Sequence, residues 1–256
     1  MKSLTGYLAS TGVTPNIVEF YTSFGSPFWA EAFNAAESIG AVPLMQWNPE
    51  GIGIGSIADG SADGYLRTFA SAIRDYRCPV ILSFGHEMNG NWFRWGYEHT
   101  SPAVFVAAWR RIVDIFASEQ ASNVTWLWTV NAQARGDPVV SPLAPWWPGA
   151  AYVSWVGVAG YYRTAGETFE SLFGSTLPQI RQLAPNTPVL IAETAVDVGA
   201  PDALVQLTDL FSGVSSQRLR GLIWFDIKAQ EDWALEDNPA VLAAFRAAAA
   251  NWLQGS

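Results

Sequence analysis

The sequence predicts an α/β fold of the (β/α)8 TIM-barrel type. Three observations support this prediction. The chain has 256 residues, half of which are apolar while only 14% are charged, so one large core can form. Short apolar runs alternate with helical patterns, which indicates parallel strands joined by helical crossovers. No linker-like stretch or internal repeat divides the chain, so we expect residues 1–256 to form a single domain.

Seven short runs that are rich in apolar and β-branched residues predict the strands. They are Ile17–Tyr21, Val42–Gln46, Val80–Ser83, Val124–Thr129, Trp155–Gly160, Val189–Ala192 and Gly221–Phe225. The helical patterns are Phe28–Ser38, Tyr65–Tyr76, Ala103–Ser118, Phe169–Leu183, Ala203–Phe211 and Ala240–Leu253.

The N-terminal segment determines how many strands the barrel has. Leu4, Tyr7 and Leu8 follow helical spacing, and Gly12 is a natural C-terminal stop for a helix. The stretch before the first predicted strand is also too short for a parallel crossover, which needs about a dozen residues. We therefore expect a helix over Ser3–Thr11 and a barrel that lacks its first strand in this chain.

The composition excludes several classes of partner. The formal net charge is −9, and the arginines form no basic run, so the positive surface that nucleic acid requires is missing. A helix needs about 20 consecutive apolar residues to cross a bilayer, and no run in the sequence approaches this length. We therefore expect no membrane partner. An acidic surface fits a neutral ligand better than an anionic polymer. We expect the protein to be a monomer.

Two predicted strands lead into a glutamate. The apolar run at 80–85 is followed by His86 and Glu87, and the run at 189–192 is followed by Glu193. In a parallel barrel the active site lies at the carboxyl ends of the strands, where a pair of carboxylates can hydrolyse glycosides. An isolated glutamate at a strand end is more often a solvated side chain. The aromatic and amide-rich loop at 88–96 favours the functional interpretation.

The same segment does not predict a metal site. A helical zinc motif needs a second histidine four residues after His86, but this position is Gly90, and His99 is the only other histidine. We expect no metal and no cofactor.

These motifs together resemble glycoside hydrolase family 26, whose known members include β-mannanases, mixed-linkage β-glucanases and β-1,3-xylanases. The segments that carry the resemblance are His86-Glu87-Met88-Asn89-Gly90 with Trp92 and Trp95-Gly96, Ala108-Trp109-Arg110-Arg111, Asn123-Val124-Thr125-Trp126-Leu127-Trp128 with Asn131, the segment 152–161, Ala192-Glu193, and Trp224-Phe225 through Asp232-Trp233. The resemblance covers the chain from the N-terminal helix to the closing helix.

The resemblance implies an activity and a mechanism. Glu87 would be the acid/base and Glu193 the nucleophile of a retaining, endo-acting glycoside hydrolase. Its substrate would be a β-linked neutral polysaccharide, either β-mannan or β-1,3-1,4-glucan. Residues 1–256 would be its catalytic domain. Retention by double displacement requires the two carboxyl groups to lie about 5 to 5.5 Å apart.

Further residues receive roles from the same resemblance. His86 would hydrogen-bond the sugar before the scissile bond, and Tyr161 would orient Glu193, although either could be purely structural. Asn89 would reach the same sugar or cap a turn.

The tryptophans of the rim loops are candidates for contacts with sugar rings. Trp92 and Trp233 could offer flat apolar faces to a pyranose, and Trp47 could extend the cleft.

The sequence also departs from the family pattern. Mannanases of the family carry Arg directly after the platform tryptophan, whereas here Ala234 follows, which weakens a mannan assignment. One alternative is a non-catalytic or inactive carbohydrate-binding barrel fragment, although both glutamates are present. A second is transglycosylation in place of hydrolysis. We expect secretion of the natural protein, but the N-terminal segment has no signal-peptide pattern.

Overall fold

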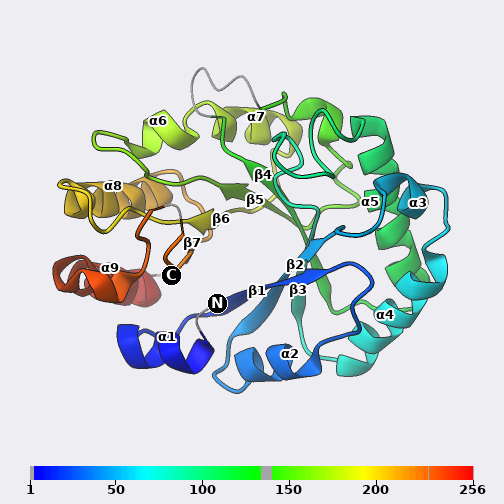
Figure 1. The fold of residues 1–256 in the computed structure, drawn as a ribbon, viewed down its shortest axis with the longest axis horizontal. Helices are drawn as coiled ribbons and strands as arrows, with labels where there is room; N and C mark the ends of the chain where they lie inside the picture. Colours follow the sequence, from blue (N-terminus) through cyan, green and yellow to red (C-terminus); the bar gives the residue numbers. More distant parts are fainter. Residues whose placement is uncertain (1–2, 134–139, 230, 256) are drawn as a thin grey trace.

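The computed structural model describes residues 3–133, 140–229 and 231–255. Within these residues seven parallel strands form one sheet in chain order, which curls into a barrel with the helices outside it (Figure 1). The strands are β1 (Ile17–Ser23), β2 (Val42–Asn48), β3 (Val80–Phe84), β4 (Val124–Asn131), β5 (Trp155–Ala159), β6 (Val189–Thr194) and β7 (Leu222–Trp224). The structure therefore confirms the predicted barrel and all seven predicted strands.

The helices lie mostly where the sequence predicts them. They are α1 (Leu4–Thr11), α2 (Ala30–Glu37), α3 (Ile54–Ala58), α4 (Asp63–Tyr76), α5 (Pro102–Ser118), α6 (Phe169–Phe173), α7 (Thr176–Leu183), α8 (Ala203–Ser216) and α9 (Pro239–Gly255), with 3-10 turns η1 (Ala144–Trp146) and η2 (Leu235–Asp237). The short helix α3 was not predicted, and α8 extends five residues beyond its predicted end at Phe211.

The N-terminal helix has the capping residues that the sequence indicates. The Ser3 hydroxyl accepts a hydrogen bond from the Gly6 N–H at 3.1 Å and so caps the first turn of α1. Gly12 ends the helix with φ of 65°, a left-handed conformation that glycine adopts at low cost. The prediction of a helix here is confirmed.

One predicted helix is interrupted. The pattern at 169–183 forms two helices, α6 and α7, instead of a single one. At the break the Ser175 hydroxyl donates to the Gln133 carbonyl, and the Thr176 hydroxyl accepts from the Gln133 N–H at 2.7 Å. These bonds to the chain beyond β4 hold the turn, which helical periodicity alone does not reveal.

The barrel interior changes from apolar to polar toward the carboxyl ends of the strands. Its apolar floor consists of Leu44, Ile81, Leu127, Leu190 and Ala192. Gln46, Ser83 and Thr129 lie two residues beyond the first three of these and therefore point to the same side of the sheet. The Ser83 and Thr129 hydroxyls are 2.8 Å apart and hydrogen-bonded. The polar end of the interior is where catalytic groups of such barrels lie.

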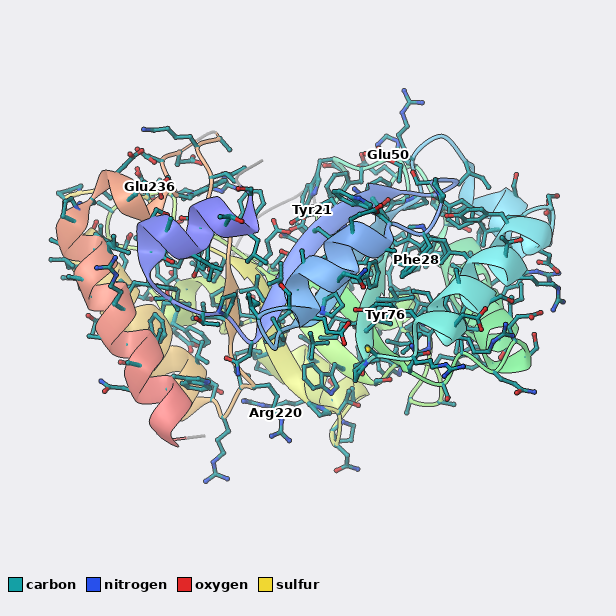
Figure 2. The ribbon with its side chains drawn as sticks, turned by 90° about the horizontal axis from the view of Figure 1, so that it is seen from below. Tyr21, Phe28, Glu50, Tyr76, Arg220 and Glu236 are labelled. Carbon is teal, nitrogen blue, oxygen red and sulfur yellow. The ribbon has the colours of Figure 1, made fainter. Side chains whose placement is uncertain are left out.

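The described strands leave the barrel open between β1 and β7. No pairing joins these two strands among the described residues, whereas a complete barrel of this type has eight strands. A cavity of about 880 Å³ lies at this position, lined by residues of α1, β1, β7 and α9. The Arg246 guanidinium of α9 donates to the Ser10 carbonyl of α1 at 3.2 Å, so the two helices meet on the outside. Figure 2 shows Glu50 and Glu236 at one end of the barrel and Arg220 at the other.

Candidate active site

A tight turn places Glu87 over the carboxyl end of β3. Gly85 has φ of 56°, and a Cβ there would come within 2.9 Å of Phe105 Cε2, so the chain needs glycine at this point. Glu87 itself has φ of 54°, which is uncommon and costly for a residue with a side chain. Its N–H donates to the Thr129 carbonyl at 2.9 Å, which holds this conformation. Strain of this kind is concentrated at functional sites.

The Glu87 carboxyl group lies 7% exposed between two donors. Asn131 Nδ2 donates to Oε1 at 2.7 Å, and Trp92 Nε1 donates to Oε2 at 2.9 Å. Burial, and then the negative charge of Glu193, raise the pKa of Glu87 to about 7. Asn131, Trp92 and the charge of Arg163 act in the opposite direction. Glu87 can therefore carry a proton near neutral pH.

The second carboxyl group, Glu193, is held by two tyrosines. It lies near the carboxyl end of β6 and is 8% exposed. The Tyr161 hydroxyl donates to Oε1, which is the contact that the resemblance implies, and the Tyr21 hydroxyl donates to Oε2. Burial raises the pKa of Glu193 above its usual value, although the hydrogen bonds from both tyrosines and the charge of Arg163 act against this rise. The two tyrosine donors thus favour the ionised form of Glu193. The negative neighbour of Glu87, in contrast, favours the protonated form of Glu87.

A third carboxyl group, Glu19 of β1, belongs to the same cluster, although it was not predicted from the sequence. Gln46 Nε2 donates to Glu19 Oε1 at 2.7 Å, and the Tyr21 hydroxyl oxygen lies 3.5 Å from Glu19 Oε2. Burial, followed by the charge of Glu193, raises the pKa of Glu19 well above its usual range. The available signal was the alternation of Ile17, Glu19 and Tyr21, which turns all three side chains to one face of the strand.

His86 is buried under the aromatic loop. Its ring makes edge contacts with Phe93, with centroids 4.9 Å apart, and lies 5.8 Å from Trp95. Burial lowers the pKa of His86 to about 4, so the imidazole is neutral near pH 7. Its Nδ1 has no hydrogen-bond partner among the described residues.

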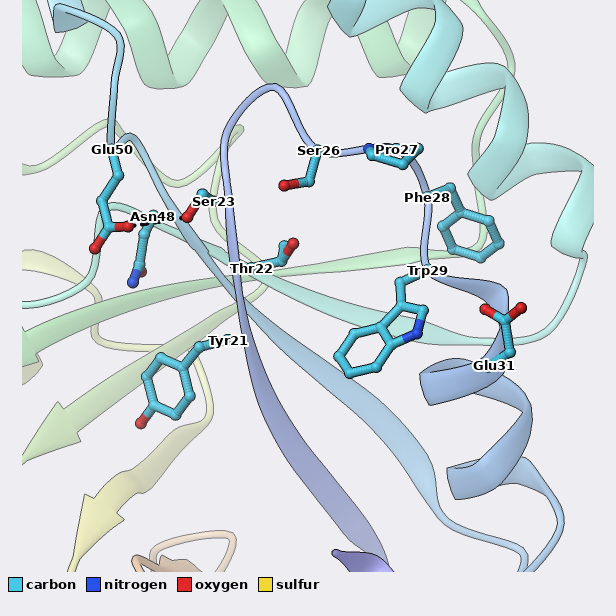
Figure 3. A pocket seen from close by; sticks show the side chains of 10 residues that line it. All are labelled: Tyr21, Thr22, Ser23, Ser26, Pro27, Phe28, Trp29, Glu31, Asn48 and Glu50. Atoms are coloured by element: carbon cyan, nitrogen blue, oxygen red, sulfur yellow. Dashed lines mark hydrogen bonds between the residues drawn. The ribbon is translucent and has the colours of Figure 1, made fainter. Parts of the chain in front are cut away.

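A pocket of about 570 Å³ opens beside Tyr21 at the same end of the barrel (Figure 3). Its lining is Tyr21, Thr22, Ser23, Ser26, Pro27, Phe28, Trp29, Glu31, Asn48 and Glu50. The Trp29 side chain is 51% exposed, and the Ser23 hydroxyl donates to Glu50 Oε2 at 2.9 Å. Asn48 Oδ1 has no hydrogen-bond partner among the residues that the structure covers. An exposed aromatic face beside carboxylate and amide groups suits a sugar ring.

Comparison with known proteins identifies the family. The model of Glycosyl hydrolase family 26 matches residues 64–244, which include both Glu87 and Glu193. The chain belongs to glycosyl hydrolase family 26.

Relatives of this family 26 chain include enzymes named for different polysaccharides. Endoglucanase H of Acetivibrio thermocellus is 26% identical over 249 residues, which are 91% of this chain and 27% of that protein. The mannan endo-1,4-beta-mannosidase A and B of Caldalkalibacillus mannanilyticus is 32% identical over 83 residues, 30% of this chain and 15% of that protein. The chain thus spans about a quarter or less of these relatives. Among solved structures, a double mutant of the Cellulomonas fimi endo-beta-1,4-mannanase matches with TM-score 0.73 at 19% identity, covering 96% of this chain and 65% of that one.

Two tryptophans predicted as sugar contacts are instead packing residues in this family 26 chain. Trp47 is fully buried because Phe24 and Phe69 stack on it, with centroids 5.1 and 4.6 Å away. Trp233 is 3% exposed and stacks on Tyr161 with centroids 4.6 Å apart. Trp233 therefore supports the tyrosine that binds the second glutamate and offers no open face to a sugar.

Asn89 is also placed differently from the prediction. It is fully buried, its Nδ2 donates to the Asn131 carbonyl at 2.9 Å, and its Oδ1 accepts from the Asn131 N–H at 2.8 Å. Both ends of the amide are thus used to fix Asn131, which in turn contacts Glu87. Trp92 is 43% exposed beside Glu87, and its contact with substrate stays a prediction.

The described part of this family 26 chain contains neither a metal-binding cluster of side chains nor a membrane-spanning helix. No group of three or more His, Cys, Asp or Glu side chains in it is arranged to hold a metal ion. None of its described helices is both long and apolar enough to cross a membrane.

Proposed function

We propose that the chain is a retaining β-glycoside hydrolase in which Glu193 is the nucleophile and Glu87 the acid/base. The observation that carries the proposal is the contrast between the two carboxyl environments. Burial favours the protonated form of both groups, but two phenolic donors stabilise negative charge on Glu193, whereas a negative neighbour adds to the effect of burial on Glu87. Pairs of titratable groups whose environments favour opposite protonation states are typical of acid/base catalysis.

The reaction would follow from these protonation states. Glu193 attacks the anomeric carbon while Glu87 donates its proton to the glycosidic oxygen, which leaves as a hydroxyl group. Glu87 is then ionised and removes a proton from the water that hydrolyses the glycosyl-enzyme. With a pKa of about 7, about half of the Glu87 groups are protonated at neutral pH, whereas an ordinary glutamate would be almost fully ionised.

The substrate in this proposal is a neutral β-linked polysaccharide, β-mannan or β-1,3-1,4-glucan, which the enzyme cuts internally. One relative is named an endoglucanase and another a mannan endo-1,4-beta-mannosidase, while two more are named beta-1,3-xylanases. The pocket beside Tyr21 supports a polymeric substrate because it offers room for a second sugar unit next to the catalytic carboxyl groups. The pocket adjoins Tyr21, which contacts Glu193, and it does not adjoin the acid Glu87. We therefore assign the pocket to the part of the polysaccharide that becomes covalently linked to Glu193.

A substrate screen with matched variants tests the proposal. Purified protein is incubated with β-mannan, β-1,3-1,4-glucan, xylans and laminarin, together with the Glu87→Gln and Glu193→Gln variants, and the released anomer is followed by NMR. We expect cleavage of mannan or mixed-linkage glucan with retained configuration, and its loss in both variants. Activity that survives Glu193→Gln contradicts the mechanism. Binding of polysaccharide without cleavage by the intact protein identifies a non-catalytic carbohydrate-binding barrel.

A further inference from the structure

The Tyr21 hydroxyl lies between two carboxyl groups and can satisfy only one of them. It donates to Glu193 Oε2, while its oxygen is 3.5 Å from Glu19 Oε2. A phenol has a single proton, and the much closer contact with Glu193 shows where this proton points. The Tyr21 oxygen therefore presents a lone pair, not a proton, to Glu19.

The remaining contacts of Glu19 define which of its oxygens can donate. Oε1 accepts the hydrogen bond from Gln46 Nε2 at 2.7 Å, so this oxygen has no need of a proton. Oε2 faces the Tyr21 oxygen. An ionised carboxylate only accepts hydrogen bonds, so an ionised Glu19 would place two acceptors opposite each other. A protonated Glu19 would instead donate from Oε2 to Tyr21.

The charges around Glu19 also favour its neutral form. Its pKa is raised by burial and by the charges of Glu193 and Glu87, whereas the hydrogen bond from Gln46 and the contact with Tyr21 act against them. The further titratable groups that line the cavity between β1 and β7 are Tyr7, Glu31, Arg220 and Asp226. Of these, Arg220 lies at the opposite end of the barrel (Figure 2).

We propose that Glu19 is a neutral carboxylic acid that donates to the Tyr21 hydroxyl oxygen and thereby keeps the Tyr21 proton on Glu193. Glu19 is then a positioning residue that acts through Tyr21, and the proposal rests on the proposed nucleophilic role of Glu193. Consecutive hydrogen bonds polarise one another, so the chain from Glu19 through Tyr21 strengthens the stabilisation of the ionised nucleophile. A neutral Glu19 also spares Glu193 the repulsion of a second negative charge.

The pH dependence of kcat/KM distinguishes the two states of Glu19. Glu19→Leu removes the donor, so we expect about a tenfold loss of kcat/KM and an acid limb at higher pH. Glu19→Gln restores it, because the amide oxygen accepts from Gln46 while the NH2 group donates to Tyr21. We expect this variant to lie within about threefold of wild type with its acid limb in place. If Glu19 were ionised, both variants would remove a negative charge and move the acid limb to lower pH, which would overturn the proposal.

Infrared spectroscopy tests the same point without relying on catalysis. The parent protein carries Glu87→Gln, so that the acid/base makes no contribution to the signal of protonated carboxyl groups. At neutral pH we expect the spectrum to contain the carbonyl band of a protonated carboxylic acid. Adding Glu19→Gln should remove this band. Adding the control substitution Glu50→Gln at the exposed rim should leave it in place. A spectrum that Glu19→Gln leaves unchanged overturns the proposal, whether or not the protein hydrolyses any polysaccharide. Circular dichroism confirms that each variant is folded.

Discussion

Replacing Trp92 by Phe is predicted to move the alkaline limb of the activity profile to higher pH. The indole N–H donates to Glu87 Oε2 at 2.9 Å, and because it cannot accept, it stabilises only the ionised carboxylate. Phenylalanine keeps an aromatic face but removes this donor. The pKa of Glu87 should then rise above its value of about 7. Because the protonated form is the catalytic acid, activity should persist to higher pH.

The size of the shift follows from the exposure of Trp92. A hydrogen bond to a charged group contributes about 1.5 to 3 kcal/mol when water is excluded. The Trp92 side chain is 43% exposed, so water replaces part of the lost donor. We therefore expect an effect of about 1 kcal/mol, or about 0.7 pH unit. The measurement is kcat/KM on a soluble oligosaccharide across the alkaline limb.

Trp29→Phe is the matched control. Trp29 is also an exposed rim tryptophan, 51% exposed, and it lines the pocket beside Tyr21 without being a donor to Glu87. Its substitution should weaken use of long substrates but leave the alkaline limb in place. An alkaline limb that stays fixed in Trp92→Phe, or that moves to lower pH, would refute the inferred bond between the indole and the ionised acid/base.

Three further predictions follow from the contacts of the site and the core. Tyr161→Phe removes one of the two donors to Glu193, so we expect about a tenfold or greater loss of kcat and an acid limb at higher pH; an unchanged limb contradicts this. Trp47→Ala should cost about 3 to 5 kcal/mol in urea denaturation because Trp47 is fully buried, and a loss near zero would disprove its packing role. Glu87→Gln should stabilise the fold at alkaline pH by about 1 to 3 kcal/mol. Folding raises the pKa of Glu87 from 4.5 to about 7, so the wild-type protein loses stability as the pH rises through this interval. The gain in stability of the variant should vanish below about pH 4.5, and a gain that does not depend on pH would contradict this link between protonation and folding.

The sequence was informative about the strands and the two glutamates at their ends. Parallel strands of a barrel bring their carboxyl ends to one rim, so residues that follow an apolar run are placed together by connectivity alone. Glu87 and Glu193 satisfy this rule, and the structure brings both within one cluster. The N-terminal helix was equally predictable, because its cap Ser3 and its stop Gly12 act locally.

The sequence was less informative about which aromatic and polar side chains face the site. Trp47 and Trp233 both follow a strand, as a sugar platform would, yet their rings are covered by neighbours that are distant in the chain. Glu19 is part of the site although it lies within a strand, because its side chain accepts a hydrogen bond from Gln46 of the neighbouring strand and senses the charge of Glu193.

By itself the sequence determined the barrel class, the positions of its seven strands and the two glutamates that we propose as catalytic. These features depend on periodicity, capping and connectivity, which are properties of neighbouring residues. Only the tertiary structure decided that Tyr21 and Tyr161 hold Glu193, that Trp47 and Trp233 are packing residues, and that a third carboxyl group joins the site. The physical reason is that hydrogen bonding, burial and the raised pKa values depend on distances between strands, which no local pattern specifies.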